Sequence, residues 1–396
     1  MTEPRAYDFE TTVDRTGTGA AKWEHMRAAN PDVPAGISPF SVADLDLKIA
    51  PEIIEGLHEH LQDAVLGYTM ATDDYWDAVT GWFRDRHDWT VDREHILLAP
   101  GVVPAFNTAV RAVTAPGDGV IVQTPAYYPF FGAIEGNGRV VVRNPLVERD
   151  GRWRIDLDDL AEKAADPRTT ALLFCSPHNP TGRVWEREEL EAVWRVARDN
   201  QLTVISDEIH FDLLMPGIAH TVFSTLNEDA AARTIVCTAP SKTFNLAGMA
   251  TSNIVISDEG LREKYATEQG RTGFFTLNAL GFQACRLAYT KAGAWLDGLI
   301  DLVHGNHELV RSFLAERMPE VTVYDLEGTY LQWMDFRALG LTAEELERLH
   351  QQDALVFFDE GAMFGPEGEG FERMNLAAPR RAVEEALERL AQAHGR

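Results

Sequence analysis

Three short polar segments carry side chains that could act together in covalent and proton-transfer chemistry. Lys242 lies in the segment Ala239–Gly248, and Asn179 and Asp207 stand in two polar segments before it. A buried lysine has a lowered pKa, so its amine can attack a carbonyl to form an imine and can move protons. A carboxylate can keep a nearby nitrogen protonated, and an amide can donate to an oxygen. These residue types predict amine–carbonyl chemistry centred on Lys242.

The elements that must position these residues are short apolar strands that alternate with helices. Each of the three segments follows an apolar run of strand length, and so does Pro100–Gly101. Short runs alternating with helical patterns predict an α/β fold with a mostly parallel sheet covered by helices. Ligands bind at the carboxyl ends of the strands in such sheets. The expected strands are 96–99, 120–122, 140–142, 171–174, 203–205, 235–237 and 253–256, and the expected helices include 53–66, 102–114 and 187–200.

The chain is expected to have two domains and an N-terminal arm, because 396 residues exceed one simple core. Residues 46–285 carry the alternating pattern and form the large domain, whereas residues 286–396 predict a smaller C-terminal α+β domain. Residues 1–45 are rich in proline, glycine and polar residues with little periodicity, so we expect an arm that wraps a partner and joins the small domain. The small-domain patterns are helices at 292–318, 343–352 and 379–393 and apolar runs at 321–323, 330–333 and 355–357.

Composition excludes several classes of partner. Sixty-two acidic residues against 36 basic ones give a net charge of −26, which repels nucleic acid and anionic membranes. The three scattered cysteines, Cys175, Cys237 and Cys285, predict reduced, buried thiols. The polar N-terminus predicts no signal peptide, and no apolar run approaches the ~18 residues of a membrane span. We therefore expect a cytoplasmic protein.

Asn179, Asp207 and Lys242, in this order, resemble the cofactor-binding residues of fold-type I pyridoxal-phosphate (PLP) enzymes, the aspartate aminotransferase superfamily. Asp207 follows Asn179 by 28 residues and precedes Lys242 by 35, as the resemblance requires. More narrowly, the amino-acid sequences of Asp207–His210 and Ala239–Asn245 resemble those of the cystathionine β-lyase (C–S lyase) branch known as the MalY/PatB family. The resemblance covers nearly the whole chain.

The resemblance implies a role for each residue that would touch the cofactor ring. Lys242 forms the imine with PLP and moves the substrate's Cα proton. Asp207 keeps the pyridine nitrogen protonated, so that the ring accepts electrons from the Cα carbanion. Asn179 donates its amide to the ring oxygen. His210 stands where aminotransferases carry a tyrosine that donates to the same oxygen, a departure shared with the C–S lyase branch.

The cofactor phosphate needs donors of its own in this acidic chain. The backbone N–H groups of Val102 and Val103, at the start of a predicted helix, are the expected cradle. The hydroxyls of Thr238 and Ser241 could add further donors. Many relatives have an arginine eight residues after the lysine, where this chain has Ala250. The phosphate charge must therefore be balanced in another way.

Further residues are implied for the ring face, the second subunit and the substrate. Tyr127 is expected to stack on the pyridine ring, with Tyr128 as the alternative. Tyr68 resembles a tyrosine that reaches the phosphate from the other subunit, which would require a homodimer; a core tyrosine is the alternative. Arg373 resembles the arginine that grips the substrate α-carboxylate with its planar fork. Tyr330 is expected to line the substrate side.

Three functions compete for this set of residues. A C–S β-lyase would cleave L-cystathionine or related L-cysteine thioethers or disulfides to pyruvate, ammonia and a thiol. An aminotransferase would use the same lysine to move the proton from Cα to the cofactor. The wording of Asp207–His210, Ala239–Asn245 and Thr329–Trp333 favours the lyase. A non-catalytic regulator is disfavoured, because the short acidic N-terminus leaves no room for a DNA-binding segment.

Two other sequence signals lead to no additional site. The histidines in 58–60 and 304–308 lack the HExxH and HxxEH spacings of metal sites, so we expect no bound metal. The glycines of 365–370 follow no nucleotide-binding pattern and predict a mobile loop over the site.

Overall fold

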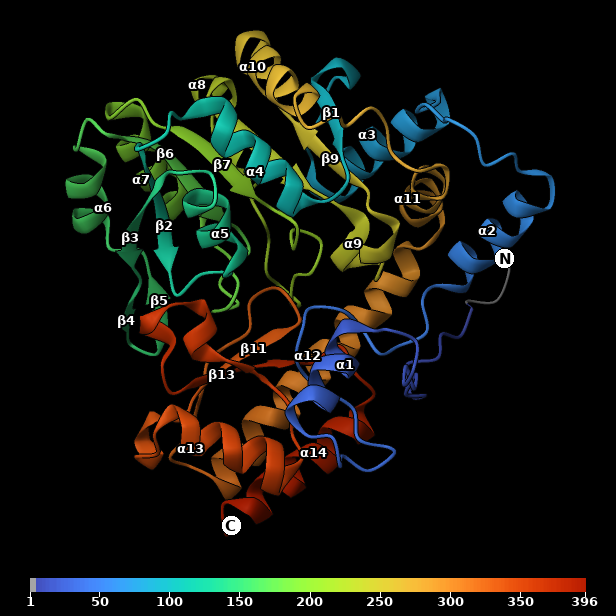
Figure 1. Ribbon diagram of the computed structural model, residues 1–396, viewed down its shortest axis with the longest axis vertical. Helices are drawn as coiled ribbons and strands as arrows, with labels where there is room; N and C mark the ends of the chain where they lie inside the picture. The colour runs from blue at the N-terminus through green and yellow to red at the C-terminus, as the bar shows by residue number, and fades with distance from the viewer. Residues whose placement is uncertain (1–4) are drawn as a thin grey trace.

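A seven-stranded sheet forms the centre of the large domain in the computed structural model, which describes residues 5–396 (Figure 1). Its strands are β1 (Ile96–Ala99), β2 (Gly119–Thr124), β3 (Val140–Pro145), β6 (Thr169–Cys175), β7 (Thr203–Asp207), β8 (Thr234–Thr238) and β9 (Ser252–Val255). They follow the order β1-β9-β8-β7-β6-β2-β3. Strand β9 runs antiparallel to β1 and β8, and the other neighbours are parallel. The seven predicted strands and the mostly parallel sheet are confirmed.

The central strands are apolar because helices cover both of their faces. All six residues of β2 are buried. On one face of the sheet, Val120 and Val122 belong to a core cluster with residues of α4 (Val102–Val113), α5 (Pro129–Glu135) and α10 (Glu259–Gly270). On the opposite face, Ile121 belongs to a core cluster with residues of α6 (Leu157–Ala164) and α7 (Arg187–Asp199). Successive side chains point to opposite faces of a strand, so a doubly covered strand is a continuous apolar run.

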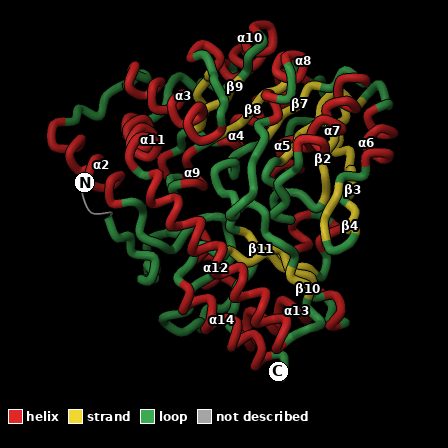
Figure 2. Tube along the Cα trace, turned by 180° about the vertical axis from the view of Figure 1, so that it is seen from behind, coloured by secondary structure: helices red, strands yellow, loops and turns green. Residues whose placement is uncertain are grey.

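A second, antiparallel sheet organises the small domain, where the sequence predicts an α+β fold. Its order is β10-β11-β13-β12, with β10 (Thr322–Val323), β11 (Leu331–Asp335), β12 (Asp359–Glu360) and β13 (Phe371–Asn375). Helix α12 (Gly293–Arg317) runs from the large domain into the small one, where α13 (Ala343–Arg348) and α14 (Arg380–Ala393) join it (Figures 1 and 2). The buried residues of α14 recur at helical spacing, as on a helix with one apolar face.

The N-terminal arm contains a helix that its sequence does not indicate. Helix α1 (Ala21–Ala29) buries Trp23 and Met26 against Phe357 of the small domain in the same chain. The sequence has little periodicity there, because only three residues of the helix are buried and one of them is the charged Lys22. Helix α11 (Ala279–Lys291) contacts both α2 (Pro51–Asp63) and α3 (Asp73–His87) beside the large sheet. Residue 285 lies within α11, and the domain boundary placed there stays a prediction.

Two local predictions differ from the structure. Residues 355–357 form no strand, because the chain leaves α13 through a π-helical turn and Leu355 adopts a left-handed φ of 53°. The strand starts only at β12. The predicted loop 365–370 contains a short 3-10 helix, and a second 3-10 helix, Gly361–Phe364, precedes it. The carbonyl of Phe364 accepts a hydrogen bond from the N–H of Ala126. Its mobility stays a prediction.

The cysteines agree with a further expectation. All three cysteines are buried and unpaired, as predicted. Among residues 5–396, none of the helices combines the length and the apolar character needed to cross a membrane.

Candidate active site

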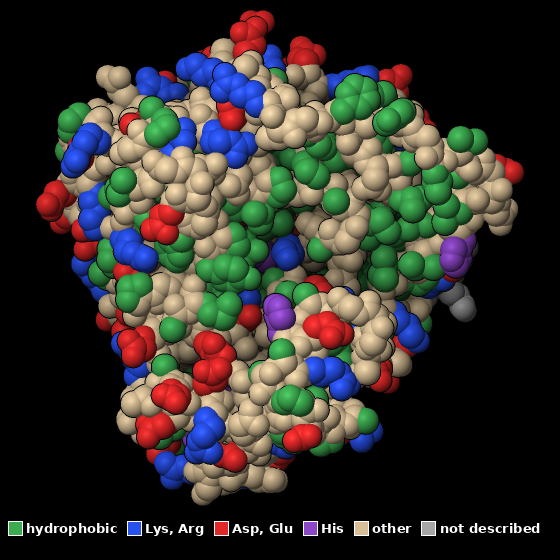
Figure 3. Space-filling view, in the orientation of Figure 1, with side chains coloured by type: hydrophobic (Ala, Val, Ile, Leu, Met, Phe, Trp, Pro, Cys, Tyr) green, Lys and Arg blue, Asp and Glu red, His purple; other side chains and the backbone are tan. Residues whose placement is uncertain are grey.

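A pocket that is partly open to solvent lies at the carboxyl edge of the large sheet. Figure 3 shows that the molecular face is hollowed between the large and small domains. The sequence-predicted residues that line the pocket are Val102, Val103, Tyr127, Asn179, Asp207, His210, Ser241 and Lys242.

Lys242 stands in a one-turn helix, α9 (Pro240–Thr243), which follows β8 directly. Its Nζ donates to the carbonyl of Ala43 at 2.7 Å. Burial lowers the pKa of the amine from 10.5 to about 8; Asp44 opposes this shift and Arg373 adds to it. Roughly a tenth of the amine is therefore neutral at pH 7, far more than for a lysine with the ordinary pKa of 10.5. A neutral amine can act as a nucleophile and as a base.

Asp207 is the last residue of β7 and is buried. Its Oδ1 accepts the N–H of Ile209 at 3.1 Å. Burial raises the pKa of the carboxyl from 3.8 to about 7, although this N–H and the charge of Lys242 both act to lower it. A cationic nitrogen placed beside this carboxylate would remove the penalty of burying its charge.

Asn179 and Arg373 form one hydrogen-bonded unit, although 194 residues separate them in the chain. The Arg373 guanidinium donates to Asn179 Oδ1 at 2.7 Å and to Asp359, and it lies over the ring of Phe364. Because the amide oxygen of Asn179 is occupied, its Nδ2 is the group left to donate to a ligand in the pocket. Arg373 is buried behind Asn179, and its grip on a substrate carboxylate stays a prediction.

The N-terminus of α4 faces the same pocket and suits an anion. Gly101 has a φ of 145°, a conformation that favours glycine, and lets the backbone N–H groups of Val102 and Val103 lead into the helix. No side chain caps this end and no acidic residue lies in its first turn. Among the described residues that line the pocket, Lys242 is the one basic side chain. A phosphate here would depend on the helix dipole and neutral donors.

His210 and Tyr127 keep neutral rings in the pocket. Burial and the nearby charges of Lys242 and Arg373 lower the pKa of His210 well below 6.5, which favours the uncharged imidazole. Its buried Nδ1 has no hydrogen-bond partner within the described chain and is open to a ligand. Burial also raises the pKa of Tyr127, so its phenol stays protonated.

Besides Arg373, three predicted residues lie outside the pocket lining. Thr238 is buried in β8, and its hydroxyl donates to the carbonyl of Asn253 at 2.8 Å, which directs it into the sheet. Tyr330 is buried and donates to the carbonyl of Ala43 at 2.9 Å. Tyr68 is 98% exposed on a loop after α2, so within one chain it does not reach the pocket.

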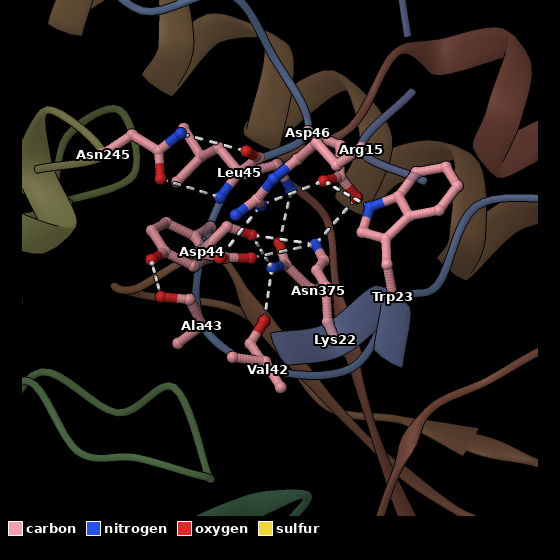
Figure 4. Close-up of polar contacts among 12 residues, drawn as sticks. Arg15, Lys22, Trp23, Val42, Ala43, Asp44, Leu45, Asp46, Asn245 and Asn375 are labelled. Atoms are coloured by element: carbon pink, nitrogen blue, oxygen red, sulfur yellow. Dashed lines mark hydrogen bonds and ion pairs between the residues drawn. The ribbon is translucent and has the colours of Figure 1, made fainter. Parts of the chain in front are cut away.

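Sequence reasoning missed the contribution of residues 42–46. Ala43 lines the pocket opposite the sheet, and its neighbours make a dense set of polar contacts (Figure 4). The segment has no periodicity and belongs to the arm that was expected to wrap a partner. The two acidic residues Asp44 and Asp46, close together in an otherwise apolar stretch, were the available signal.

The residues present fit PLP. Lys242 would bond the aldehyde carbon, Asp207 would face the pyridine nitrogen, and Asn179 and His210 would serve the ring oxygen. The uncapped end of α4 would hold the phosphate. With a mostly parallel sheet that delivers these residues from its strand ends, and a small α+β domain beside it, the chain is a PLP-dependent enzyme of fold type I.

Comparison with known proteins gives the family. The aminotransferase class I and II family matches residues 39–390, and the chain belongs to it. It is 40% identical to cystathionine beta-lyase PatB of Bacillus subtilis (strain 168) over 97% of this chain and 98% of that protein. It is 31% identical to protein MalY of Escherichia coli (strain K12) over 96% and 97% of the two chains. The structure of cystalysin from Treponema denticola, which contains a PLP cofactor, has a TM-score of 0.97 and 46% identity over 99% of both chains.

Proposed function

We propose that this protein is a PLP-dependent C–S β-lyase that acts on L-cystathionine or related thioethers and disulfides of L-cysteine. Its products are pyruvate, ammonia and a thiol, or a persulfide when the substrate is a disulfide. The observation that carries the proposal is the near full-length similarity to a cystathionine β-lyase, at 40% identity over 97% of the chain. The pocket supports it with a lysine amine, a buried carboxylate and an anion-binding helix end. Asn179, Asp207 and Lys242 suit a lyase and an aminotransferase alike, whereas the sequences of Asp207–His210 and Ala239–Asn245 favour the lyase.

The chain's own residues bind the substrate and move its proton. The planar fork of Arg373 suits a bidentate grip on the α-carboxylate, which fixes the orientation of the amino acid. The neutral amine of Lys242 takes the proton from Cα, since its pKa of about 8 lies close to the working pH. Asp207 holds a positive charge on the ring nitrogen. PLP, when bound, would supply an electron sink for the electrons left at Cα, so that a thiolate can depart from Cβ.

Turnover without a keto acid separates the lyase from the aminotransferase. With L-cystathionine or L-cystine, we expect continuous release of pyruvate and ammonia with no added acceptor, because elimination leaves the cofactor in its starting form. An aminotransferase would stop after one turnover, with the amino group held on the cofactor. The measurement is pyruvate released per active site with and without 2-oxoglutarate. Turnover that depends wholly on the keto acid would establish the aminotransferase instead.

We further propose a homodimer that acts in the cytoplasm. Tyr68 lies among large apolar side chains that are unusually exposed, and its ring meets that of Phe275 edge-on at 6.4 Å. Such a patch is typical of an interface. The exposed fractions are 89% for Val65, 66% for Leu66, 98% for Tyr68, 64% for Met70 and 72% for Phe275. A second subunit would cover this loop and bring Tyr68 to the partner's phosphate site. The unpaired cysteines support a reducing compartment.

Mixing two inactive variants tests the shared site. Tyr68→Phe and Lys242→Ala each damage both sites of their own dimers. A mixed dimer has one site with both wild-type residues, so random exchange is expected to restore about a quarter of wild-type activity. The measurement is pyruvate release during mixing, with exchange followed by energy transfer between labelled subunits. Exchange without any recovery would show that Tyr68 acts within its own chain or not at all.

A further inference from the structure

One backbone carbonyl fixes the position of the Lys242 amine. The carbonyl oxygen of Ala43 accepts the Nζ of Lys242 at 2.7 Å and the hydroxyl of Tyr330 at 2.9 Å. These two donors use both lone pairs of the oxygen. Any shift of Ala43 therefore moves the acceptor to which the lysine amine is bound.

Ala43 belongs to residues 42–46, here named the strap, which form no helix or strand. Val42 has a left-handed φ of 54°, a conformation that a β-branched residue adopts only when its surroundings impose it. Two small-domain side chains hold it: its N–H donates to Asp359 at 2.9 Å, and its carbonyl accepts Asn375 Nδ2 at 2.8 Å. The strap is thus shaped by its contacts rather than by its own preference.

Lys22 of helix α1 holds the strap from the side of the small domain. Its side chain is 2% exposed, and its Nζ lies 2.9 Å from Asp46 Oδ2 and donates to the Asp44 carbonyl at 2.9 Å. The indole N–H of Trp23 donates to the other carboxylate oxygen of Asp46 at 3.0 Å. Figure 4 shows Lys22 and Trp23 pointing from α1 toward the strap.

Asn245 holds the strap from the side of the large domain, three residues after Lys242. Its Nδ2 donates to the Leu45 carbonyl at 3.0 Å, and its Oδ1 accepts the Leu45 N–H at 3.1 Å. Its φ of 56° is one that asparagine tolerates better than most residues. The turn that carries the lysine is therefore bound to the strap at two alternate residues, Ala43 and Leu45.

We propose that Lys22 and Asn245 are positioning residues, which hold the strap so that the Ala43 carbonyl orients the amine of Lys242 toward the Cα proton. A neutral amine that donates one N–H to this carbonyl keeps its lone pair directed elsewhere, into the pocket. Small misplacements of a reacting group are costly, up to roughly 100-fold per ångström. Because neither residue lines the pocket, the loss falls on the proton-transfer rate and not on substrate affinity. The inference rests on the proposed role of Lys242.

The test uses the holoenzyme and two readouts. The first is exchange of the Cα proton of L-alanine with deuterium in heavy water, followed by NMR. L-alanine has no leaving group at Cβ, so this rate reports the action of Lys242 in a lyase and in an aminotransferase alike. The second is backbone hydrogen exchange of the peptide that contains residues 42–46, measured by mass spectrometry. Failure of the lyase proposal alone leaves both readouts usable.

The main variant is Asn245→Gly, which removes the amide while glycine keeps the left-handed backbone. We expect faster strap exchange, Cα exchange slowed roughly 10- to 100-fold, and a KM for L-alanine within about threefold of wild type. Lys22→Met should act in the same direction, and Lys22→Arg should restore part of the rate. The matched control is Asn144→Ala, which removes a buried amide that bonds Gln123, Asp156 and Asp159 away from the pocket.

Two results would overturn the inference. One is faster strap exchange in Asn245→Gly with an unchanged rate of Cα exchange. The other is a loss in Asn144→Ala as large as in Asn245→Gly, since the effect would then follow general stability. If Asn245→Gly fails to fold, the pair Lys22→Met and Lys22→Arg decides by the same criteria: a slowed Cα exchange that arginine does not relieve counts against a positioning role.

Discussion

Lys242→Ala is expected to lower turnover by at least ~10²–10⁴-fold, the usual contribution of a positioned acid–base group, while the protein stays folded. The loss is large because one amine has two tasks: the covalent attachment of PLP and the transfer of the Cα proton. The lowered pKa of about 8 makes the amine available for both. The measurements are pyruvate release per active site and thermal unfolding of the variant beside the wild type.

Borohydride reduction of the wild-type holoenzyme provides the direct check on this assignment. Reduction should fix the pyridoxyl group on Lys242, where peptide mapping will find it. Lys264, exposed on α10, is a suitable control position: Lys264→Ala should keep full turnover and the same labelled peptide. A pyridoxyl group on any lysine other than Lys242 would remove Lys242 from the centre of the site.

The sequence predicts that Asn179, Asp207 and Lys242 lie close together, because this follows from the local strand pattern and the sheet topology alone. Each residue ends or follows one of three neighbouring parallel strands, β6, β7 and β8. The carboxyl ends of parallel neighbours lie at one edge of a sheet, so residues that follow such strands converge there. Short apolar runs between polar turns were enough to place the strands.

Contacts between distant segments could not be predicted in the same way. The bond between Ala43 and Lys242 joins residues 199 positions apart, and the strap has no periodicity that would show which side it buries. The pairing of Arg373 with Asp359 depends on the register of β12 against β13, which no local sequence pattern shows. The direction of the Thr238 hydroxyl could not be predicted for a related reason: it donates to the carbonyl of Asn253 in the neighbouring strand β9.

Asp207→Asn is expected to have opposite effects on activity and on the stability of the PLP-free protein. Turnover should fall, because the ring nitrogen loses the carboxylate that keeps it protonated. Removing one partner of a buried charge pair costs about 3–5 kcal/mol, which corresponds to a loss of turnover of roughly 10²–10³-fold or more. In the PLP-free protein the buried charge of this carboxylate destabilises the folded state, because no cation faces it. Burial accordingly raises the pKa of Asp207 from 3.8 to about 7.

The sign of the stability effect follows from this raised pKa. A group whose pKa is higher in the folded protein favours folding below its unfolded pKa, near 3.8, and this contribution is lost as the pH rises through about 7. The shift corresponds to a free energy of unfolding of up to about 4 kcal/mol. Asparagine has no charge to bury, so the PLP-free variant should be more stable than the PLP-free wild type at pH 8 and should lose that advantage at pH 4.

Thermal unfolding of both PLP-free proteins at pH 4, 6 and 8 measures the effect, alongside turnover of the reconstituted proteins. Asp77→Asn, on the exposed face of α3, is the control and should change neither quantity. A variant that loses turnover and is also less stable at pH 8 would show that Asp207 is a structural residue whose charge is well compensated in the folded chain. A variant that gains stability and loses turnover identifies a carboxylate kept in an unfavourable place for the cation it must hold.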